Sequence, residues 1–328
     1  MHFTRTGPDN LRRFTPTMLR SDLTAMGRII RLETNSPALR HQVGKTFDHN
    51  GSAPSGPGDF VWRLVVEDVE EPHPPQGEIS GMSVDGLHLF HIGQGSFFAV
   101  DRAARLAIGF VRGELVKDRQ GFERLFLAPL FTATAESLGL TAFSAACLAL
   151  EGKGLLVLGP SQECKTICCF AASKKGLQFH SNQVVFLDSL GGELRAWGDF
   201  WPADLGPESA KAFPELVNRD LAAGSGDSTV QGVEGLQLRA RGTQSVRPAC
   251  GVILSPHVGG IRIRKQMDRR AWEAMAQENC LVTNHERWGA EQDDMVRILG
   301  SLPAYQLDYR GDPFSVVEAF RSILEAAP

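Results

Sequence analysis

A strand, a loop and a helix in direct succession near the middle of the chain restrict its fold more strongly than any other segment. Residues 154–158 (GLLVL) are apolar and suit a buried strand. Residues 159–166 read G-P-S-Q-E-C-K-T, which is one residue away from the pattern G-x-x-x-x-G-K-[ST]. Residues 167–175 then read as a helix that ends at Gly176. This order predicts a phosphate-binding loop (P-loop) within an α/β fold.

The chemistry of such a loop assigns roles to its residues. Backbone N–H groups and the N-terminus of the following helix surround a phosphate. The lysine reaches the β- and γ-phosphates and the hydroxyl ligates magnesium, and Lys165 and Thr166 keep these two roles. Where the pattern has glycine, a cysteine with a positive φ would carry about 1–3 kcal/mol of strain. The expected nucleotide-binding residues are Gly159, Ser161, Gln162, Glu163, Cys164, Lys165 and Thr166.

Composition indicates a well-buried core and two domains. The chain has 328 residues, 42% of them hydrophobic and 22% charged. We expect a smaller, β-rich α+β domain over residues 1–120 and the P-loop domain over residues 121–328. The net charge of −4 gives no general attraction to nucleic acid. No apolar run has the length of a membrane span, and residues 1–31 lack the apolar core of a signal peptide, so a cytoplasmic protein is expected.

Hydrophobic periodicity and turn signals predict the other elements. The first domain is expected to contain a helix over 37–47 and strands over 59–69, 79–84, 87–92, 96–100 and 106–111, and a helix over 122–137, broken or kinked near Pro129, is expected to lead into the second domain. The second domain is expected to contain strands over 177–180, 184–187, 237–241, 252–254 and 304–307, and helices over 208–213, 268–279, 292–299 and 313–326.

The cysteine pattern argues against a zinc site. The chain has six cysteines and no pair of C-x-x-C motifs. Their apolar surroundings predict reduced, buried thiols. Cys164 is the exception that the sequence leaves open, because a helix N-terminus and the neighbouring Lys165 both lower the pKa of a thiol.

Residues 143–188 resemble the catalytic core of HPr serine kinase/phosphorylase and its relatives. That family has a histidine-bearing strand, a strand ending in the P-loop, a helix ending in Lys/Arg-Gly, and a strand carrying two adjacent aspartates. Here residues 144–148 (SAACL), the loop 159–166, Lys174-Lys175-Gly176 and residues 181–185 (SNQVV) fall at these places in turn. Residues 302–307 (LPAYQL) are similar to a closing strand of the group. The resemblance implies a PEP-carboxykinase-like mixed sheet with flanking helices, ATP and magnesium as ligands, and a homo-oligomer.

The chain departs from this family where the chemistry takes place. Ser144 stands in place of the histidine, and Asn182 and Gln183 replace the acidic pair. Amides cannot accept a proton as a general base, and they ligate magnesium less well than carboxylates. Loss of a general base costs about 10²–10⁴ in rate.

Two nearby residues can replace the missing groups. Asp188 ends an apolar run, as a magnesium-positioning aspartate does in many P-loop proteins, and would share the ion with Thr166. His180 lies two residues before Asn182 and can act as a base. The alternatives are a strand-ending surface aspartate and a structural histidine. Asp199 and Asp204, on either side of 200–202 (FWP), could reach the site, and the favoured alternative is that they cap loops.

The sequence therefore leaves two functions open. The first is an HPr-kinase-related pseudokinase, a module that binds a nucleotide or a protein or peptide partner. The second is an active ATP-dependent serine/threonine phosphotransferase that acts on a protein or peptide hydroxyl, with Asp188 or His180 as the catalytic group.

Overall fold

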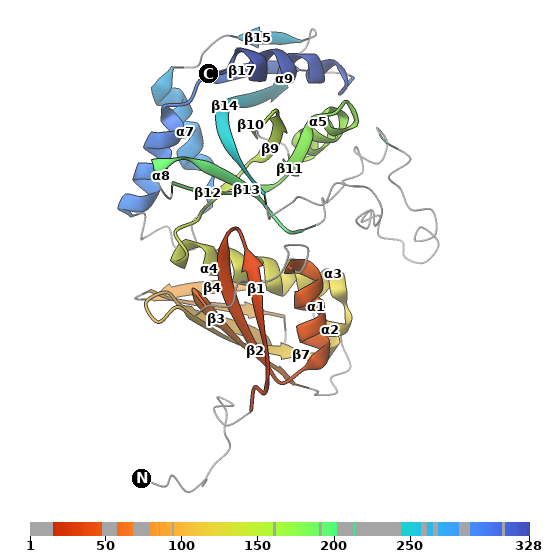
Figure 1. Cartoon of the computed structure of the whole chain (residues 1–328), viewed down its shortest axis with the longest axis vertical. Helices are drawn as coiled ribbons and strands as arrows, with labels where there is room; N and C mark the ends of the chain where they lie inside the picture. Colours follow the sequence, from red (N-terminus) through yellow and green to blue (C-terminus); the bar gives the residue numbers. More distant parts are fainter. Residues whose placement is uncertain are drawn as a thin grey trace, which may run out of the picture. The chain divides into compact units, whose positions relative to one another are not determined.

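The chain folds into two compact units, each of the mixed α/β type. The computed structural model describes residues 16–47, 58–67, 79–84, 86–93, 95–159, 162–189, 192–201, 213, 244–256, 261–264, 268–281, 289–309 and 312–328. Described residues up to 24 and from 28 to 134 form the first unit, and residues 25–27 and those from 135 onward form the second. Each unit has one mixed sheet and flanking helices (Figure 1).

A seven-stranded sheet forms the first unit. Its order is β1-β2-β3-β7-β6-β5-β4, with β2, β3 and β7 parallel and β7, β6, β5 and β4 joined as antiparallel neighbours. The strands are β1 (Leu19–Ala25), β2 (Arg28–Thr34), β3 (Phe60–Glu67), β4 (Ile79–Val84), β5 (Leu87–Ile92), β6 (Ser96–Asp101) and β7 (Leu106–Arg112). The antiparallel run is the predicted series of short alternating strands, and the structure confirms it.

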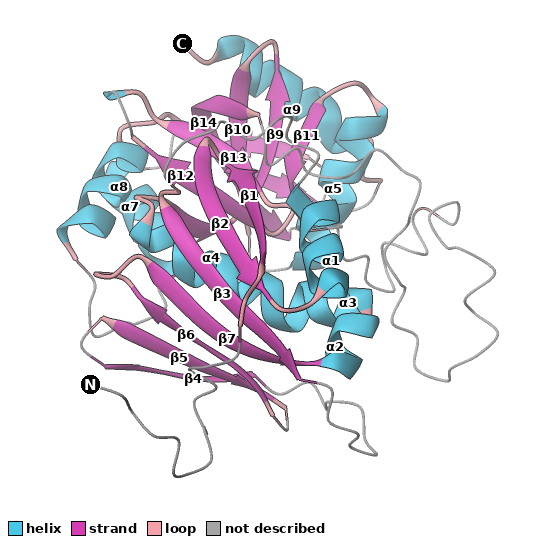
Figure 2. Ribbon diagram, turned by 60° about the horizontal axis from the view of Figure 1, so that its bottom comes forward, coloured by secondary structure: helices cyan, strands magenta, loops and turns pink. Residues whose placement is uncertain are grey.

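Helices cover one face of this sheet (Figure 2). They are α1 (Pro37–Phe47), α2 (Gly113–Lys117), α3 (Arg119–Gly121), the π-helical segment η2 (Phe122–Leu127) and α4 (Ala128–Ser137). The indole of Trp62 packs edge-on against the rings of Phe47 and Phe131, and its Nε1 donates to Thr134 Oγ1 at 3.0 Å. Phe126 packs against Phe98 in the same core. Because these helical side chains are buried here, residues 121–134 belong to the first unit rather than to the domain expected from residue 121.

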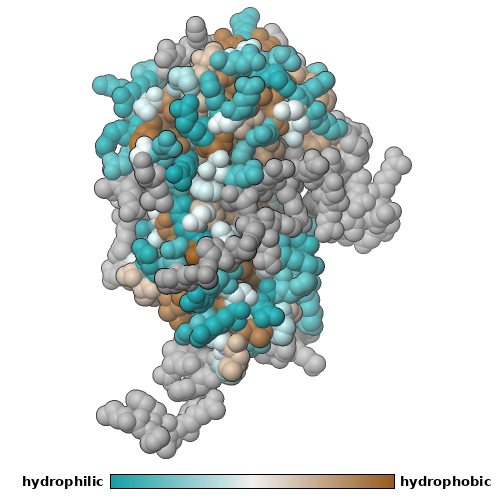
Figure 3. All heavy atoms as spheres, viewed as in Figure 1, coloured by the Kyte–Doolittle hydropathy of each residue, from teal (hydrophilic) through white to brown (hydrophobic). Residues whose placement is uncertain are grey.

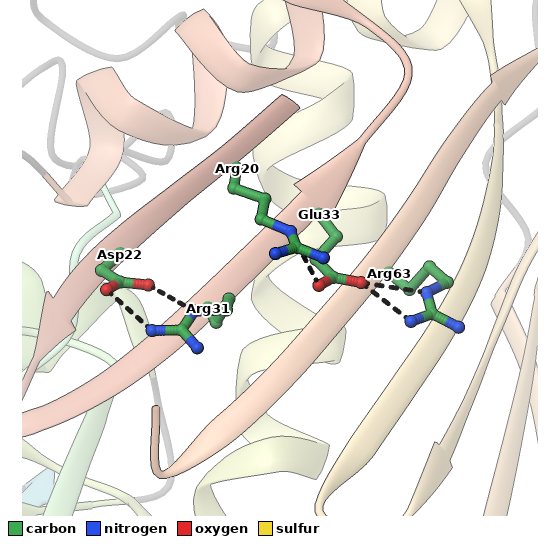
Figure 4. Close-up of polar contacts among 5 residues, drawn as sticks. All are labelled: Arg20, Asp22, Arg31, Glu33 and Arg63. Carbon is green, nitrogen blue, oxygen red and sulfur yellow. Dashed lines mark hydrogen bonds and ion pairs between the residues drawn. The ribbon is translucent and has the colours of Figure 1, made fainter. Parts of the chain in front are cut away.

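The opposite face of the sheet carries a charged cluster on β1, β2 and β3 (Figure 4). The Arg31 guanidinium donates to both carboxylate oxygens of Asp22, at 2.8 and 3.0 Å. Glu33 lies between Arg63, at 2.8 Å, and Arg20, at 3.3 Å. The hydrogen bonds with Asp22 raise the pKa of Arg31 above its ordinary value. These pairs fix the register of β2 against its neighbours by charge as well as by packing.

The sheet of the second unit runs β11-β9-β10-β14-β13-β12-β8-β16, and β17 and β15 continue it beside β14. The strands are β8 (Thr141–Ser144), β9 (Ala146–Leu150), β10 (Lys153–Leu158), β11 (Gln178–Ser181), β12 (Val184–Asp188), β13 (Arg195–Gly198), β14 (Ser245–Pro256), β15 (Arg262–Arg264), β16 (Cys280–Leu281) and β17 (Ala304–Tyr309). The strands β10, β14 and β17 are parallel neighbours. Their burial on both sides explains the near-continuous apolar sequence of β10.

Helices pack on both sides of these central strands. Alternate residues of β10 divide between two cores: Leu155 and Val157 pack with α5 (Gln162–Lys174) and α9 (Ser315–Ala326). Leu156 and Leu158 pack with α7 (Arg269–Asn279) and α8 (Ala290–Gly300). On the face drawn in Figure 3, hydrophilic and apolar side chains are interspersed over the described surface of both units. None of the helices in the described part of the chain combines the length and the apolar character needed to cross a bilayer.

Two expectations about elements need correction. The helix after the loop begins at Gln162 rather than at residue 167. The chain stays helical through Pro129, because the wider π turn of η2 precedes it and relieves the clash with the carbonyl four residues earlier. The expectations over 208–212 and 237–241 lie outside the described residues. The β1–β2 hairpin, whose turn has Met26 at φ 50° and Gly27 at φ 75°, is an element beyond those expected.

Candidate functional site

The candidate site lies where β10 leads into α5. Gly159 follows the last residue of β10, and a Cβ there would lie 3.1 Å from the carbonyl oxygen of Leu254 on the neighbouring strand. That spacing is tighter than nearly all real Cβ contacts, so glycine fits this corner better than any other residue. The predicted phosphate contact at Ser161 lies outside the described residues.

The helix α5 starts earlier than the loop pattern implies. Residues 162–164, which include Glu163 and Cys164, already belong to α5, and only residues 159–161 connect it to β10. A helical residue has a negative φ, so the strain considered for Cys164 does not arise. The groups that can face an anion therefore belong to the first turn of α5, whose N–H groups have no partner within the helix. They do not belong to a long open loop.

Lys165 is buried at this helix start. The residue is 1% exposed, and within the described part of the chain it makes no hydrogen bond or ion pair. Burial is the largest influence on its ammonium and lowers the pKa of Lys165, an effect that the neighbouring Cys169 opposes in part. A buried ammonium without an anionic partner is costly. An anion that binds beside Lys165 would recover that cost, so the position favours a negatively charged ligand.

Thr166 lies against Asn182, where the sequence resemblance led us to expect an acid. Asn182 Nδ2 donates to Thr166 Oγ1 at 3.1 Å, and both residues are buried. The sheet explains the contact: in the register, Cys147 of β9 is opposite both Leu156 of β10 and Ser181 of β11. The strands β10 and β11 thus run in the same direction and end at the same edge, so the residue after β11 meets the start of α5.

The carboxylate of Asp199 lies beside Ser181, the last residue of β11. Ser181 Oγ donates to the carbonyl oxygen of Val184 at 2.6 Å and lies 3.3 Å from Asp199 Oδ2. Asp199 is 3% exposed, so it is a buried acid rather than the solvent-facing loop cap expected from the sequence. Its position directly after β13 is the feature of the sequence that indicates a site residue. Asp204 lies outside the described residues.

Asp188 has a different partner from the one that a magnesium role requires. Trp197 Nε1 donates to Asp188 Oδ2 at 2.9 Å, across the antiparallel pair of β12 and β13. Four rises of about 3.3 Å along β12 separate Asp188 from Val184. The aspartate therefore lies at the end of β12 that is far from Asn182 and Thr166. The contact it makes there is the hydrogen bond with the Trp197 indole. Its role in metal binding stays a prediction.

The remaining predicted residues surround the end of β11. His180 is buried in β11, one residue before Ser181. Ser144 is opposite Val184, at the bend where β8 passes into β9. The backbone N–H of Gln183 points to Ser181 Oγ at 3.4 Å. Ser144, Asn182 and Gln183 thus lie near the ends of β8, β11 and β12. Their chemical roles, and that of His180 as a base, stay predictions.

The described residues contain no group of three His, Cys, Asp or Glu side chains placed to hold a metal ion. All the cysteines whose side chains are described are buried and reduced, as the sequence predicted: Cys147, Cys168, Cys169, Cys250 and Cys280. Burial raises the pKa of Cys250 and Cys280 to about 12 and raises that of Cys147 in the same direction.

Comparison with known proteins gives a distant structural similarity. No model of a protein family matches the chain. No curated protein matches it in sequence. Among solved structures, the Hpr(Ser) kinase/phosphatase from Coxiella burnetii is similar at 9% identity and a TM-score of 0.28, over 56% of this chain and 96% of that one. The resemblance to the HPr kinases therefore depends on the residues of this chain between 143 and 188.

Proposed function

We propose that this protein is an HPr-kinase-related P-loop protein with a degenerate site, which binds the phosphates of a nucleotide at the start of α5 without transferring them. In this proposal the protein is a pseudokinase, and a protein or peptide partner senses the nucleotide-bound state. The observation that carries the proposal is Lys165, an ammonium buried at a helix N-terminus with no described anionic partner. Phosphate is the anion for which this combination is best known.

The residues beside Lys165 argue against phosphoryl transfer. Transfer to a hydroxyl needs a carboxylate that accepts the proton and groups that hold magnesium. Asn182 occupies that place with an amide, and Gln183 follows it. An amide neither accepts the proton nor carries the charge that magnesium requires. Binding groups are thus retained while the catalytic groups have changed.

A second candidate function is an active ATP-dependent serine/threonine phosphotransferase. The buried carboxylate of Asp199 favours it, because this acid lies beside Ser181, one residue from Asn182. In that case Asp199, with His180, would stand in for the missing acidic pair. The two candidates differ in whether the bound γ-phosphate is ever transferred.

Binding is tested by the thermal unfolding of the full chain with ATP. A ligand at one hundred times its Kd stabilises the folded state by about 2.7 kcal/mol. Lys165→Met keeps the apolar stem and removes the charge, so it should abolish the shift. Lys175→Met is the matched control, because Lys175 is exposed at the end of the same helix and should leave the shift unchanged. An equal shift in the wild type and in Lys165→Met would contradict the proposal.

Transfer is tested with γ-labelled ATP and a library of serine- and threonine-containing peptides. The pseudokinase predicts no labelled peptide and no release of labelled phosphate above that of Lys165→Met. Labelling that Asp199→Asn abolishes and Asp188→Asn preserves would establish the active kinase in its place.

A further inference from the structure

We infer that the site at the start of α5 binds its phosphate ligand without magnesium, because an amide group holds the place that the metal would need. This inference depends on the proposed function, since it concerns the same site. The resemblance to the HPr kinases implies magnesium, and the donor atoms around Thr166 test whether the ion fits.

The threonine oxygen is already engaged by a hydrogen-bond donor. Thr166 Oγ1 accepts a hydrogen from Asn182 Nδ2 at 3.1 Å, and Asn182 and Thr166 are 2% and 4% exposed. A magnesium ion would need that oxygen's electron pair. It would also lie close to the amide hydrogens, which carry partial positive charge. With both side chains buried, little water is available to screen this repulsion.

The carboxylates described near this site have other contacts. Asp188 accepts from the Trp197 indole at the other end of β12. Asp199 Oδ2 lies 3.3 Å from Ser181 Oγ, so this carboxylate contacts the residue before Asn182. Magnesium in proteins is held by one or two carboxylates together with substrate phosphates. The group that donates to the Thr166 hydroxyl is an amide where the ion would need a carboxylate, so this pair does not fit magnesium.

Positive charge for the ligand comes from the protein instead. Lys165 contributes a buried ammonium, and the first turn of α5 contributes free N–H groups and the positive end of the helix dipole. These groups suit a metal-free di- or triphosphate or inorganic pyrophosphate. Magnesium in solution chelates the same phosphates, so it should compete with the protein for the ligand rather than help it bind.

Calorimetric titration of the full chain with ADP and with pyrophosphate measures this directly, once with EDTA and once with excess magnesium chloride. We expect the wild type to bind both ligands in EDTA, with an affinity that magnesium leaves equal or lowers. An affinity that magnesium raises about tenfold or more would overturn the inference while leaving the proposed function intact. Absence of binding under both conditions would overturn the proposed function and the inference with it.

Two variants make the test specific to the amide. Asn182→Asp places a carboxylate beside Thr166, so its affinity in EDTA should fall at least about tenfold through repulsion of the phosphates. Magnesium should restore it, and bound manganese, measured by electron paramagnetic resonance as loss of the signal of the free ion, should increase only in this variant. The neighbouring Gln183→Glu is the control for added charge and should not gain this dependence.

A further variant covers the case in which Asn182→Asp does not fold. Thr166→Val removes the hydroxyl that a metal would use while keeping the shape of the side chain. If no metal binds there, the ratio of the affinities with and without magnesium should equal that of the wild type. A ratio that changes by about tenfold or more in Thr166→Val would show that the hydroxyl does bind the ion.

Discussion

At the scale of single residues, Asp188 is predicted to stabilise the fold rather than to bind ligand. It is fully buried and accepts from Trp197 Nε1. Asp188→Ala leaves a buried indole N–H without its partner, which should lower the free energy of unfolding by about 1–3 kcal/mol. Urea unfolding measures the loss, and Asp294→Ala, an exposed aspartate paired with Arg297, should change it by less than about 1 kcal/mol.

The same variant separates structure from function. If Asp188 has only the structural role, folded Asp188→Ala should bind ADP with the affinity of the wild type. A well-folded variant that had lost ADP binding would instead support the magnesium role predicted from the sequence.

The buried thiols predict how stability changes at alkaline pH. Burial raises the pKa of Cys250 and Cys280 from 9.0 to about 12. Between these values the unfolded chain loses the thiol protons and the folded chain keeps them. The contribution of both thiols is therefore complete below pH 9 and should decline as the pH rises towards about 12. Urea unfolding across this range measures the decline.

Two variants check the origin of that decline. Cys250→Ala should flatten the fall of the unfolding free energy with pH, because one of the thiols with a raised pKa is gone. Lys165 acts with the opposite sign, since its pKa is lowered in the folded state and its burial costs less once it is neutral. Lys165→Met should therefore steepen the fall. Identical slopes in all three proteins would contradict this assignment.

At the scale of elements, the packing of α7 on β14 depends on a glycine. A Cβ at Gly251 would lie 2.3 Å from the ring of Trp272, which is buried and donates to the carbonyl oxygen of Leu299 at 2.7 Å. Gly251→Ala should lower the free energy of unfolding by about 1–3 kcal/mol, because the indole has to move. Chemical denaturation measures the change.

A double-mutant cycle connects this loss to the indole. Trp272→Phe removes the ring atoms that the new methyl group would meet. Gly251→Ala should therefore cost less in the Trp272→Phe background than in the wild type, by about 0.5 kcal/mol or more. Additive losses would show that the helix packing tolerates a side chain at position 251.

Elements also differ in how clearly their local sequence predicts them. The strands β4, β5, β6 and β7 alternate and are separated by turn signals, so they are predictable from local pattern. The β1–β2 hairpin has similar alternation. Its polar, arginine-bearing sequence does not indicate a buried sheet, so local pattern does not predict it. The charge pairs of Figure 4 explain how these polar strands belong there, since Asp22 and Glu33 neutralise arginines on the same face.

At the scale of the whole molecule, the two units predict a ligand effect confined to one of them. Each unit has its own sheet and core, and the candidate site belongs to the second unit. Hydrogen exchange of the full chain with saturating ADP should show new protection in α5 and at the end of β11. The core strands β2, β3 and β7 should exchange as they do without ligand.

A variant tests whether this protection comes from the site. Lys165→Met should remove the added protection in α5 and leave the exchange of the first unit unchanged. Protection by ADP in β2 or β3 of the wild type would show that the ligand binds elsewhere or that the units are coupled.

The sequence alone determined the β10–α5 corner and most of the regular elements. Strand, loop and helix follow one another within residues 154–174, so their order is a property of neighbours along the chain. The same holds for the stop of α5 before Gly176, whose φ of 93° favours glycine. Periodicity and turn chemistry act over a few residues, which is why a sequence can reveal them.

Only the tertiary structure decided which side chains meet. The contact of Asn182 with Thr166 and that of Trp197 with Asp188 join residues on different strands and helices. The first depends on the register of β11 against β9, which includes an irregularity between Phe179 and Ser181, and the second on the register of β12 against β13. The burial of Lys165 depends likewise on everything packed around it. A one-residue change of register would turn these side chains to the opposite face, and local pattern alone does not fix that register.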